Sequence, residues 1–298
     1  MDEKALENSI REIIYKILED DNKPVSAAAG QNSTERDAGY EDGFVDDVTA
    51  DSLQEQFFVP NPHDREGYLR MKQTTPARLG IWRTGPRHIT KSTLRFWADH
   101  AAAQNAVWSD VDDETIKSLG CIPLRSRSKD KAEYIKNPNT GRRLNEESLE
   151  VVRKNANKKV NVQIVFADGL SSSAIVKNGK DILPALTQSL DSLGLSYGTP
   201  YFITNGRVAS GEEIGEILGC DVLIMLVGER PGLNSTSSMG AYVCYKPTVG
   251  MEESRRTVIS NIHTLGTAPV EAGAQIAELC QSMIKHKKSG VELKLVED

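Results

Sequence analysis

The chain has 298 residues, 39% of them hydrophobic, which is enough for a substantial core and one or two domains. Residues 1–60 hold 15 acidic and 5 basic side chains, so the net charge of −6 leaves +4 on the rest, too little to indicate nucleic-acid binding. No apolar run approaches the roughly 18 residues of a membrane span, and the N-terminus lacks the apolar stretch of a secretory signal. We therefore expect a protein that stays inside the cell.

The first predicted element is an amphipathic helix over residues 1–20. Its apolar side chains recur at steps of three and four residues: Leu6, Ile10, Ile13, Ile14 and Ile17. Residues 21–56 are acidic and rich in small polar side chains. We expect a disordered linker there, because such a composition buries too little apolar surface to offset the conformational entropy lost on folding. Two interpretations remain for the helix. It packs on its own domain, or it docks on another protein, for which a long linker is useful.

Residues 57–157 are predicted to form a small, mainly helical module. One helix is expected to run to residue 108 with Thr90 as its cap, and shorter helices are expected at 112–119 and 146–155. The segment between the last two is basic and rich in turn-forming residues, so no regular element is predicted there.

Residues 158–298 alternate between strand and helix patterns. Successive strand–helix–strand units predict an α/β domain: a Rossmann-like, largely parallel sheet with flanking helices. Strands are expected at 159–169, 199–207, 221–232 and 241–247. Helices are expected at 171–194, 211–219 and about 267–288.

Polar side chains follow three of these strands at the point where each ends. In open α/β sheets ligands bind beyond the carboxyl ends of the strands, so these positions outline a polar rim. Each also has a purely structural interpretation. Asp168 and Ser171 can cap the next helix, Arg207 can pair with a nearby glutamate of the helix that follows it, and Glu229 can pair with Arg230.

Signatures of familiar catalytic sites are missing from the sequence. It has no GxGxxG and no GxxxxGK[ST], and GLSSS places Ser173 where the GxSxG motif needs glycine. The five histidines do not have metal-ligand spacing, and the four widely spaced cysteines predict reduced, mostly buried thiols. A sheet with a polar rim, but without candidate acid–base residues or metal ligands, is typical of a protein that holds a cofactor.

At these same strand ends the sequence resembles the light chain of ethanolamine ammonia-lyase. The segments that carry the resemblance include TPARLGIWRTGPR, VQIVFADGLSSSAI, GTPYFITNGRV, IGEILGCDVLIMLVGERPGL and RTVISNIHTLGTAPVEAGAQI. The resemblance covers about residues 57–298.

The resemblance implies part of a lyase that depends on adenosylcobalamin (coenzyme B12). In that family, homolysis of the Co–C bond starts a radical conversion of ethanolamine to acetaldehyde and ammonia. A large TIM-barrel chain holds the substrate, and the small chain, inactive alone, covers the corrinoid from the other side in a hetero-oligomer of several large–small pairs. The alternative is a stand-alone corrinoid carrier or chaperone.

The resemblance also implies three cofactor contacts: Val208, Glu229 and Val258. We expect Val208 to pack on an apolar edge of the corrin and Glu229 to accept hydrogen bonds from amide N–H groups of the corrin or the adenine side. Relatives can carry cysteine at position 258, which indicates a backbone or packing contact. The resemblance implies no catalytic residue in this chain, since the large chain of the family holds most of them. No metal ligand is expected either, since the chain lacks the DxHxxG segment whose histidine binds cobalt in many cobalamin proteins.

Related enzymes are packaged in bacterial microcompartments through tethered helices. The resemblance therefore implies that residues 1–20 dock on a shell or core protein. The roles of Arg78, Arg83 and Arg87 stay open between contact with the large chain, binding of the cobalamin phosphate tail and ordinary surface charge.

Overall fold

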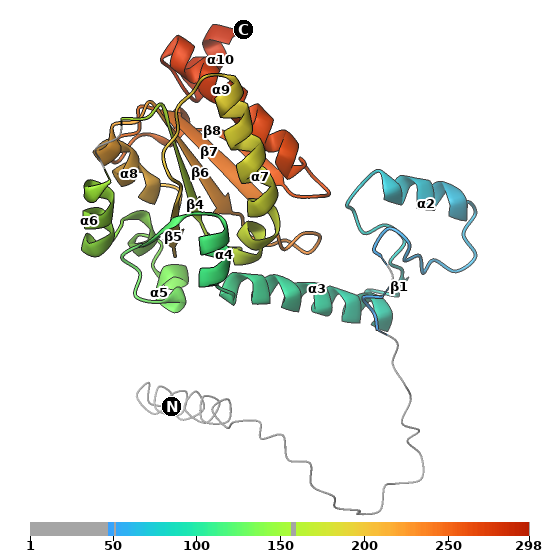
Figure 1. Cartoon of the computed structure of the whole chain (residues 1–298). Coiled ribbons are helices and arrows are strands. Elements are labelled where there is room, and N and C mark those ends of the chain that lie inside the picture. Colours follow the sequence, from blue (N-terminus) through green and yellow to red (C-terminus); the bar gives the residue numbers. More distant parts are fainter. Residues whose placement is uncertain (1–46, 51, 156–158, 298) are drawn as a thin grey trace, which may run out of the picture. The chain divides into compact units, whose positions relative to one another are not determined.

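A six-stranded mixed sheet organises the part of the chain that the computed structural model describes, residues 47–50, 52–155 and 159–297 (Figure 1). Its strand order is β3-β5-β4-β6-β7-β8. The first four strands in this order run parallel, whereas β7 is antiparallel to both of its neighbours. The strands are β3 (Ile122–Arg125), β4 (Val162–Ala167), β5 (Tyr201–Thr204), β6 (Val222–Gly228), β7 (Met239–Tyr245) and β8 (Thr257–Ile262). The predicted α/β class with a largely parallel sheet is confirmed.

Helices cover both faces of the sheet. On one face α7 (Ser172–Ser192) packs against α9 (Pro269–His286), and on the other α6 (Glu146–Lys154) packs against α8 (Ser210–Leu218). Two apolar cores result. One joins Ile164 and Phe166 of β4 to α7 and α9, and the other joins Val165 of β4 to α6 and α8. Every residue of β4 and of β6 is buried, which explains why both strands are almost continuously apolar.

The connections after β4 and β5 leave the sheet on opposite faces. The chain passes from β4 through α7 to β5, and from β5 through α8, on the other face, to β6. The loops at the carboxyl ends of these two neighbouring strands therefore diverge. Such a point is where open α/β sheets bind ligands.

Several elements were not predicted from the sequence. The edge strand β3 lies inside the segment predicted as a separate helical module, 57–157, yet pairs in parallel with β5, so that segment and 158–298 share one sheet. The edge strand β8 was also missed. The other unpredicted elements are α2 (Arg65–Gln73), the short strands β1 (Arg83–Thr84) and β2 (Arg87–His88), α5 (Lys131–Lys136), α10 (Val291–Glu297) and the 3-10 turns η1 (Thr140–Arg142) and η2 (Glu253–Arg255).

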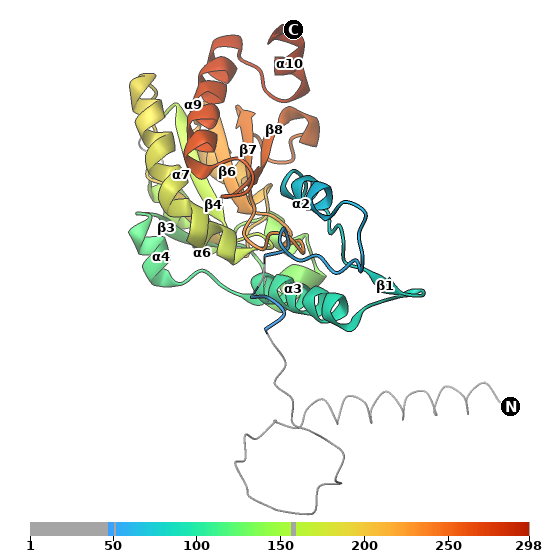
Figure 2. The same ribbon diagram turned by 90° about the vertical axis from the view of Figure 1, so that its right-hand side faces the viewer.

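The helices α3 (Thr90–Trp108) and α4 (Asp113–Ser118) were predicted. Thr90 is the first residue of α3 and not its cap, because Ile89 occupies the cap position without a side-chain hydrogen bond. Figures 1 and 2 show α3 lying across the carboxyl end of the parallel strands. Ser172, which begins α7 after β4, donates to the carbonyl of Ser109 just beyond α3 over 2.6 Å.

Arg78 fixes the N-terminal part of the described chain to the sheet. Its guanidinium donates to Asp99 of α3 (2.7 Å) and to the carbonyl of Leu233 (3.1 Å) in the loop after β6. Arg78 is therefore a structural anchor, a role that none of the three interpretations left open for it included. Of the predicted linker 21–56, residues 21–46 and 51 lie outside the described residues. In the described part, the carbonyl of Val48 accepts from Arg95 of α3.

The predicted helix of residues 1–20 lies outside the described residues. In the part of the chain that is described, none of the helices combines the length and apolar character required to cross a bilayer.

A buried ion pair, Arg256 with Glu212, joins the segment before β8 to α8. The other Glu212 oxygen accepts from the backbone N–H of Gly250 (2.8 Å). We expect Arg256→Met to lower the free energy of unfolding by about 3 kcal/mol, because it leaves a buried carboxylate without its cation. Urea denaturation measures this. Arg153→Met, which breaks the exposed pair with Glu150, is the control and should cost less than about 0.5 kcal/mol. Equal effects of the two changes would contradict the prediction.

Candidate functional site

The turn between β5 and α8 carries the first predicted contact, Val208. Val208 is half-buried and packs against the apolar core on the α6–α8 face. Asn205 begins the turn with a φ of 55°, in the left-handed region that asparagine tolerates better than most residues. In the described structure Asn205 Oδ1 and Arg207 Nε are buried without a hydrogen-bond partner. Unpaired buried polar atoms are uncommon, and here they single out this turn as a place where a further group can bind.

Side chains from two other elements hold this turn. Asp168, which follows β4, accepts from the backbone N–H of Gly206 (3.2 Å) and pairs with Lys131 of α5 (3.1 Å). The buried hydroxyl of Tyr134 donates to the carbonyl of Gly206 (3.2 Å), and the guanidinium of Arg207 lies 4.7 Å from the Tyr134 ring centre. Burial raises the pKa of Asp168, and the Lys131 ammonium partly opposes that rise. The position of Val208 is therefore fixed by contacts far away in sequence.

These contacts decide between the structural alternatives for the first two strand ends. Ser171 caps α7, since its side chain accepts from the N–H of Ala174, whereas Asp168 holds the turn before α8. Arg207 stacks on Tyr134, while Glu212 pairs with Arg256 and Glu213 with Arg143.

Glu229, the second predicted contact, connects the end of β6 to β8. One carboxylate oxygen accepts from the Ser238 hydroxyl (2.6 Å) and from the backbone N–H of Asn261 (3.3 Å), and the other accepts from the Ser260 hydroxyl. Glu229 is half-buried, and Arg230 is not among these partners. The carboxylate thus fixes the carboxyl end of β8 against β6 and still has lone pairs for a further donor.

Val258, the third predicted contact, lies on β8 with 47% of its side chain exposed. It pairs across the sheet with Tyr242 of β7, which is half-buried and packs against the same core as Val208. A Cβ at Gly240 would lie 2.8 Å from a Glu229 oxygen and 3.1 Å from the Tyr242 ring, so only glycine leaves this surface flat. Burial raises the pKa of Tyr242, and the charge of Glu229 adds to the rise.

The structure brings all three predicted residues to one face of the sheet, the face that α6 and α8 cover over the parallel strands. Alternation along the strands places Glu229, Tyr242 and Val258 on this side. Val258 and Ser260 are exposed on it. We call this surface, made of Val208, Glu229, Gly240, Tyr242, Val258 and Ser260, the open face. It offers apolar side chains flanked by one carboxylate.

His263 follows the open face at the end of β8. Its Nδ1 accepts from the N–H of Leu265 (3.2 Å), which leaves Nε2 to donate to Asn261 Oδ1 (2.8 Å), an arrangement that requires a neutral ring. Burial lowers the pKa of His263, and the charge of Glu229 opposes this. The ring thus supports the loop after β8 as an uncharged group.

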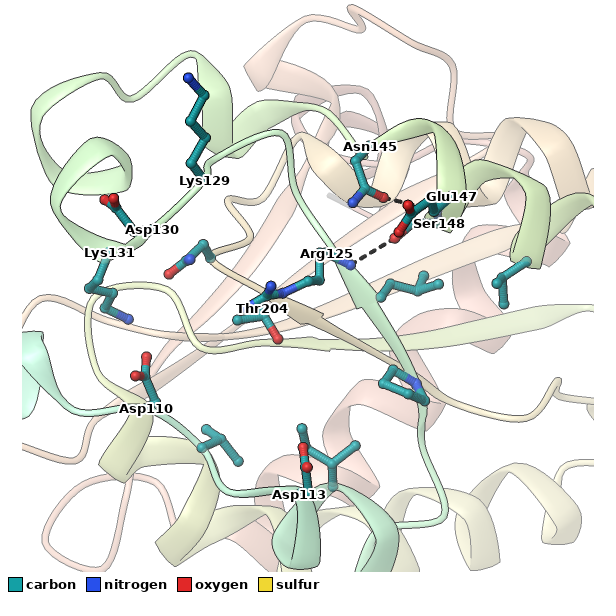
Figure 3. Close-up of a pocket in the computed structure, with 16 residues that line it drawn as sticks. Asp110, Asp113, Arg125, Lys129, Asp130, Lys131, Asn145, Glu147, Ser148 and Thr204 are labelled. Carbon is teal, nitrogen blue, oxygen red and sulfur yellow. Dashed lines mark hydrogen bonds between the residues drawn. The ribbon is translucent and has the colours of Figure 1, made fainter.

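A cavity of about 630 Å³ lies at the carboxyl ends of β3 and β5 beside the starts of α4, α5 and α6. Figure 3 shows Lys129, Asp130 and Lys131 on one side of it and Asn145, Glu147 and Ser148 on the other. Its lining contains acidic side chains (Asp110, Asp113, Asp130 and Glu147) and basic ones (Arg125, Lys129 and Lys131), so neither sign of charge dominates. None of the three predicted contacts lines it.

The four cysteines are free and buried, as predicted. Burial raises the pKa of the Cys121, Cys220 and Cys244 thiols to about 12, so they stay protonated and unreactive near neutral pH. The described residues contain no group of three or more His, Cys, Asp or Glu side chains suited to a metal ion.

Sequence reasoning missed the groups that hold the site in place: Lys131, Tyr134, Ser238 and Ser260. Serine, tyrosine and lysine outside a motif carry no signal of such a role. Only the tertiary structure shows this role, because it places these side chains next to the strand ends.

Taken together, the described residues form an α/β fold whose mixed sheet is partly uncovered on one face. Residues 65–294 match the family model of the ethanolamine ammonia-lyase light chain (EutC). The chain is 49% identical to the ethanolamine ammonia-lyase small subunit of Listeria innocua and 45% identical to that of Clostridium perfringens, in both cases over 99% of this chain and 100% of the relative. The small subunit of Fusobacterium nucleatum is 43% identical over 97% of this chain and 99% of its own.

The chain therefore belongs to the ethanolamine ammonia-lyase light chain family, and the resemblance seen in its sequence is confirmed. The alignments with the relatives also extend into residues 1–56, beyond the range 57–298 over which the resemblance was recognised.

Glu229 is expected to stabilise the fold independently of any ligand. Glu229→Gln removes the charge that strengthens three hydrogen bonds and should lower the free energy of unfolding by about 1–2 kcal/mol. Arg230→Gln, at the exposed neighbouring position, should change it by less than about 0.5 kcal/mol. Chemical denaturation of both variants measures the difference, and a Glu229→Gln protein as stable as Arg230→Gln would show that the bridge contributes nothing.

Proposed function

We propose that this chain is the small subunit of an ethanolamine ammonia-lyase and that its open face covers one side of adenosylcobalamin. Val208 and Val258 are 50 positions apart in the sequence, and Glu229 lies between them. The observation that carries the proposal is that all three lie on one partly uncovered face of the sheet. The cofactor supplies radical chemistry when bound, and a large subunit supplies the substrate site.

The residues of the open face fit such a group. A corrin is wide and flat, with an apolar ring edge and amide side chains around it. Val208, Tyr242 and Val258 offer apolar contacts. Gly240 has no side chain that would project from this surface toward the ligand. Glu229 is the acceptor for amide N–H groups, held in place by Ser238 and Ser260. The roles of this chain are to bind, to orient and to exclude water.

The open face can cover only one side of a ligand, because it is a surface and not a closed cavity. This favours a two-chain enzyme over a stand-alone corrinoid carrier. Co-expression with the large subunit tests the choice. We expect a stable complex that releases ammonia from ethanolamine only when both chains and adenosylcobalamin are present. A chain that binds cobalamin tightly alone, and gives no activity with the large subunit, would support the carrier instead.

Val258→Glu should separate ligand binding from stability. The side chain is half exposed, so the change should cost the fold less than about 0.5 kcal/mol. In the two-chain complex it should weaken cobalamin binding at least tenfold, because a charge then faces an apolar ligand edge. Equilibrium dialysis measures the affinity. Val291→Glu, 58% exposed at the start of α10, is the control and should bind cobalamin like the wild type. Equal affinities of the two variants would remove Val258 from the site.

We further propose that residues 1–20 direct the enzyme to a bacterial microcompartment. The amphipathic pattern of Leu6, Ile10, Ile13, Ile14 and Ile17 supports docking on a shell or core protein. Deleting residues 1–20 should leave turnover of the complex unchanged and move the protein from the shell fraction to the cytosol. A truncated chain that still purifies with shells, in cells whose large subunit does not bind them, would contradict this.

A further inference from the structure

The three tryptophans of the chain are all exposed. Trp82, Trp97 and Trp108 keep 43%, 61% and 55% of their surface accessible, although tryptophan is highly buried on average in folded proteins. All three lie between residues 82 and 108, in or next to the β1–β2 hairpin and in α3. Exposed aromatic side chains of this size are the residues that most often anchor protein interfaces.

The helix α3 presents two of these rings in one stripe. Trp97, Ala101, Gln104 and Trp108 follow one another at steps of four, three and four residues, so they share a face of the helix. Ala101 and the uncharged Gln104 lie between the rings, and they border a shallow hollow of about 540 Å³ together with Trp108. We call these four residues the α3 stripe.

The C-terminal half of α3 is unusual for a helix in water. From His100 to Ser109 it carries no Asp, Glu, Lys or Arg, and only Ser92, Ala103 and Ala106 of the whole helix are buried. A helix face exposed to solvent normally carries charged side chains. Depletion of charge around aromatic residues is instead the composition of an interface core.

Helix α3, which carries the stripe, lies against the loop that follows Glu229. Phe96 and His100 of α3, together with Pro231 and Leu233, line a hollow of about 330 Å³. Pro231 is two residues after Glu229, and Arg78 bonds both to α3 and to the carbonyl of Leu233. A protein that covers a ligand on the open face at Glu229 must therefore also come close to α3.

We propose that the α3 stripe, with Phe96 beside it, is a docking surface for the large subunit, which receives the Trp97 and Trp108 rings in apolar pockets. This rests on the proposed function, because that function supplies the partner and places the ligand between the two chains. The stripe extends the contact beyond the rim of the ligand site. The cofactor then binds against a pair of chains that are already aligned.

Alanine variants test the surface. Trp97→Ala and Trp108→Ala should each weaken binding of the cofactor-free large subunit at least tenfold, and the double variant should not form the complex at micromolar concentrations. Sedimentation velocity of the full chain with the large subunit measures this, and circular dichroism checks that the variants fold. The control is Leu295→Ala, which removes a side chain that is 75% exposed on α10, and it should bind like the wild type.

A second measurement reports on the rings directly. With 5-fluorotryptophan in this chain only, its three tryptophans give three fluorine resonances. Addition of unlabelled large subunit should abolish the H₂O/D₂O solvent shift at Trp97 and Trp108, because both rings leave water. Unchanged solvent shifts in a complex that has formed would overturn the proposal.

The outcomes separate the two proposals. If the wild-type chain does not bind the large subunit, the proposed function fails, and the docking surface fails with it. If the wild type binds and the tryptophan variants bind equally well, only the docking surface is wrong. If the variants instead abolish self-association of this chain alone, the stripe is an interface between copies, and the large subunit is not its occupant.

Discussion

The way in which a strand connects to the next decides which parts of this sheet are covered. Parallel neighbours need crossover connections, and these bring helices over both faces of β3, β5, β4 and β6. The strands β6, β7 and β8 are antiparallel neighbours and need no crossover. The outer strands β7 and β8 are therefore covered by α9 on one face only, and Val258 and Ser260 stay exposed on the other face. The open face is a consequence of this change from parallel to antiparallel pairing.

A surface that is open on one side needs internal bonds to keep its shape, since no covering helix packs it. Glu229 supplies them between β6 and β8 through Ser238, Ser260 and the backbone of Asn261. Asp168 and Tyr134 do the same for the turn that carries Val208, with hydrogen bonds to the N–H and the carbonyl of Gly206. The site is therefore preorganised by charge-assisted and buried hydrogen bonds, which a ligand does not have to form on binding.

The exposed aromatic side chains of α3 and the open face have the same physical origin. Each is an apolar surface that the described part of this chain does not bury, and α3 itself lies across the carboxyl end of the parallel strands (Figure 2). Arg78 bonds both to Asp99 of α3 and to the carbonyl of Leu233, in the loop that follows Glu229, and so links this helix to that loop. Membership of the light chain family implies a partner chain, and exposed apolar surface of this kind is where proteins commonly bind each other.

The sequence by itself determined the α/β class, the buried strands β4 and β6 and the helices that follow the parallel strands, because periodicity and apolar runs are local signals. It also determined the family, and the resemblance to that family predicts Val208, Glu229 and Val258 as cofactor contacts. Only the tertiary structure decided that β3, which lies in a basic, turn-rich segment, pairs with β5, and that β8 forms an edge whose alternation is too weak to recognise. It alone brought Lys131 and Tyr134 to the turn of Val208, because pairing and contact between distant residues depend on the closed fold and leave no local pattern in the chain.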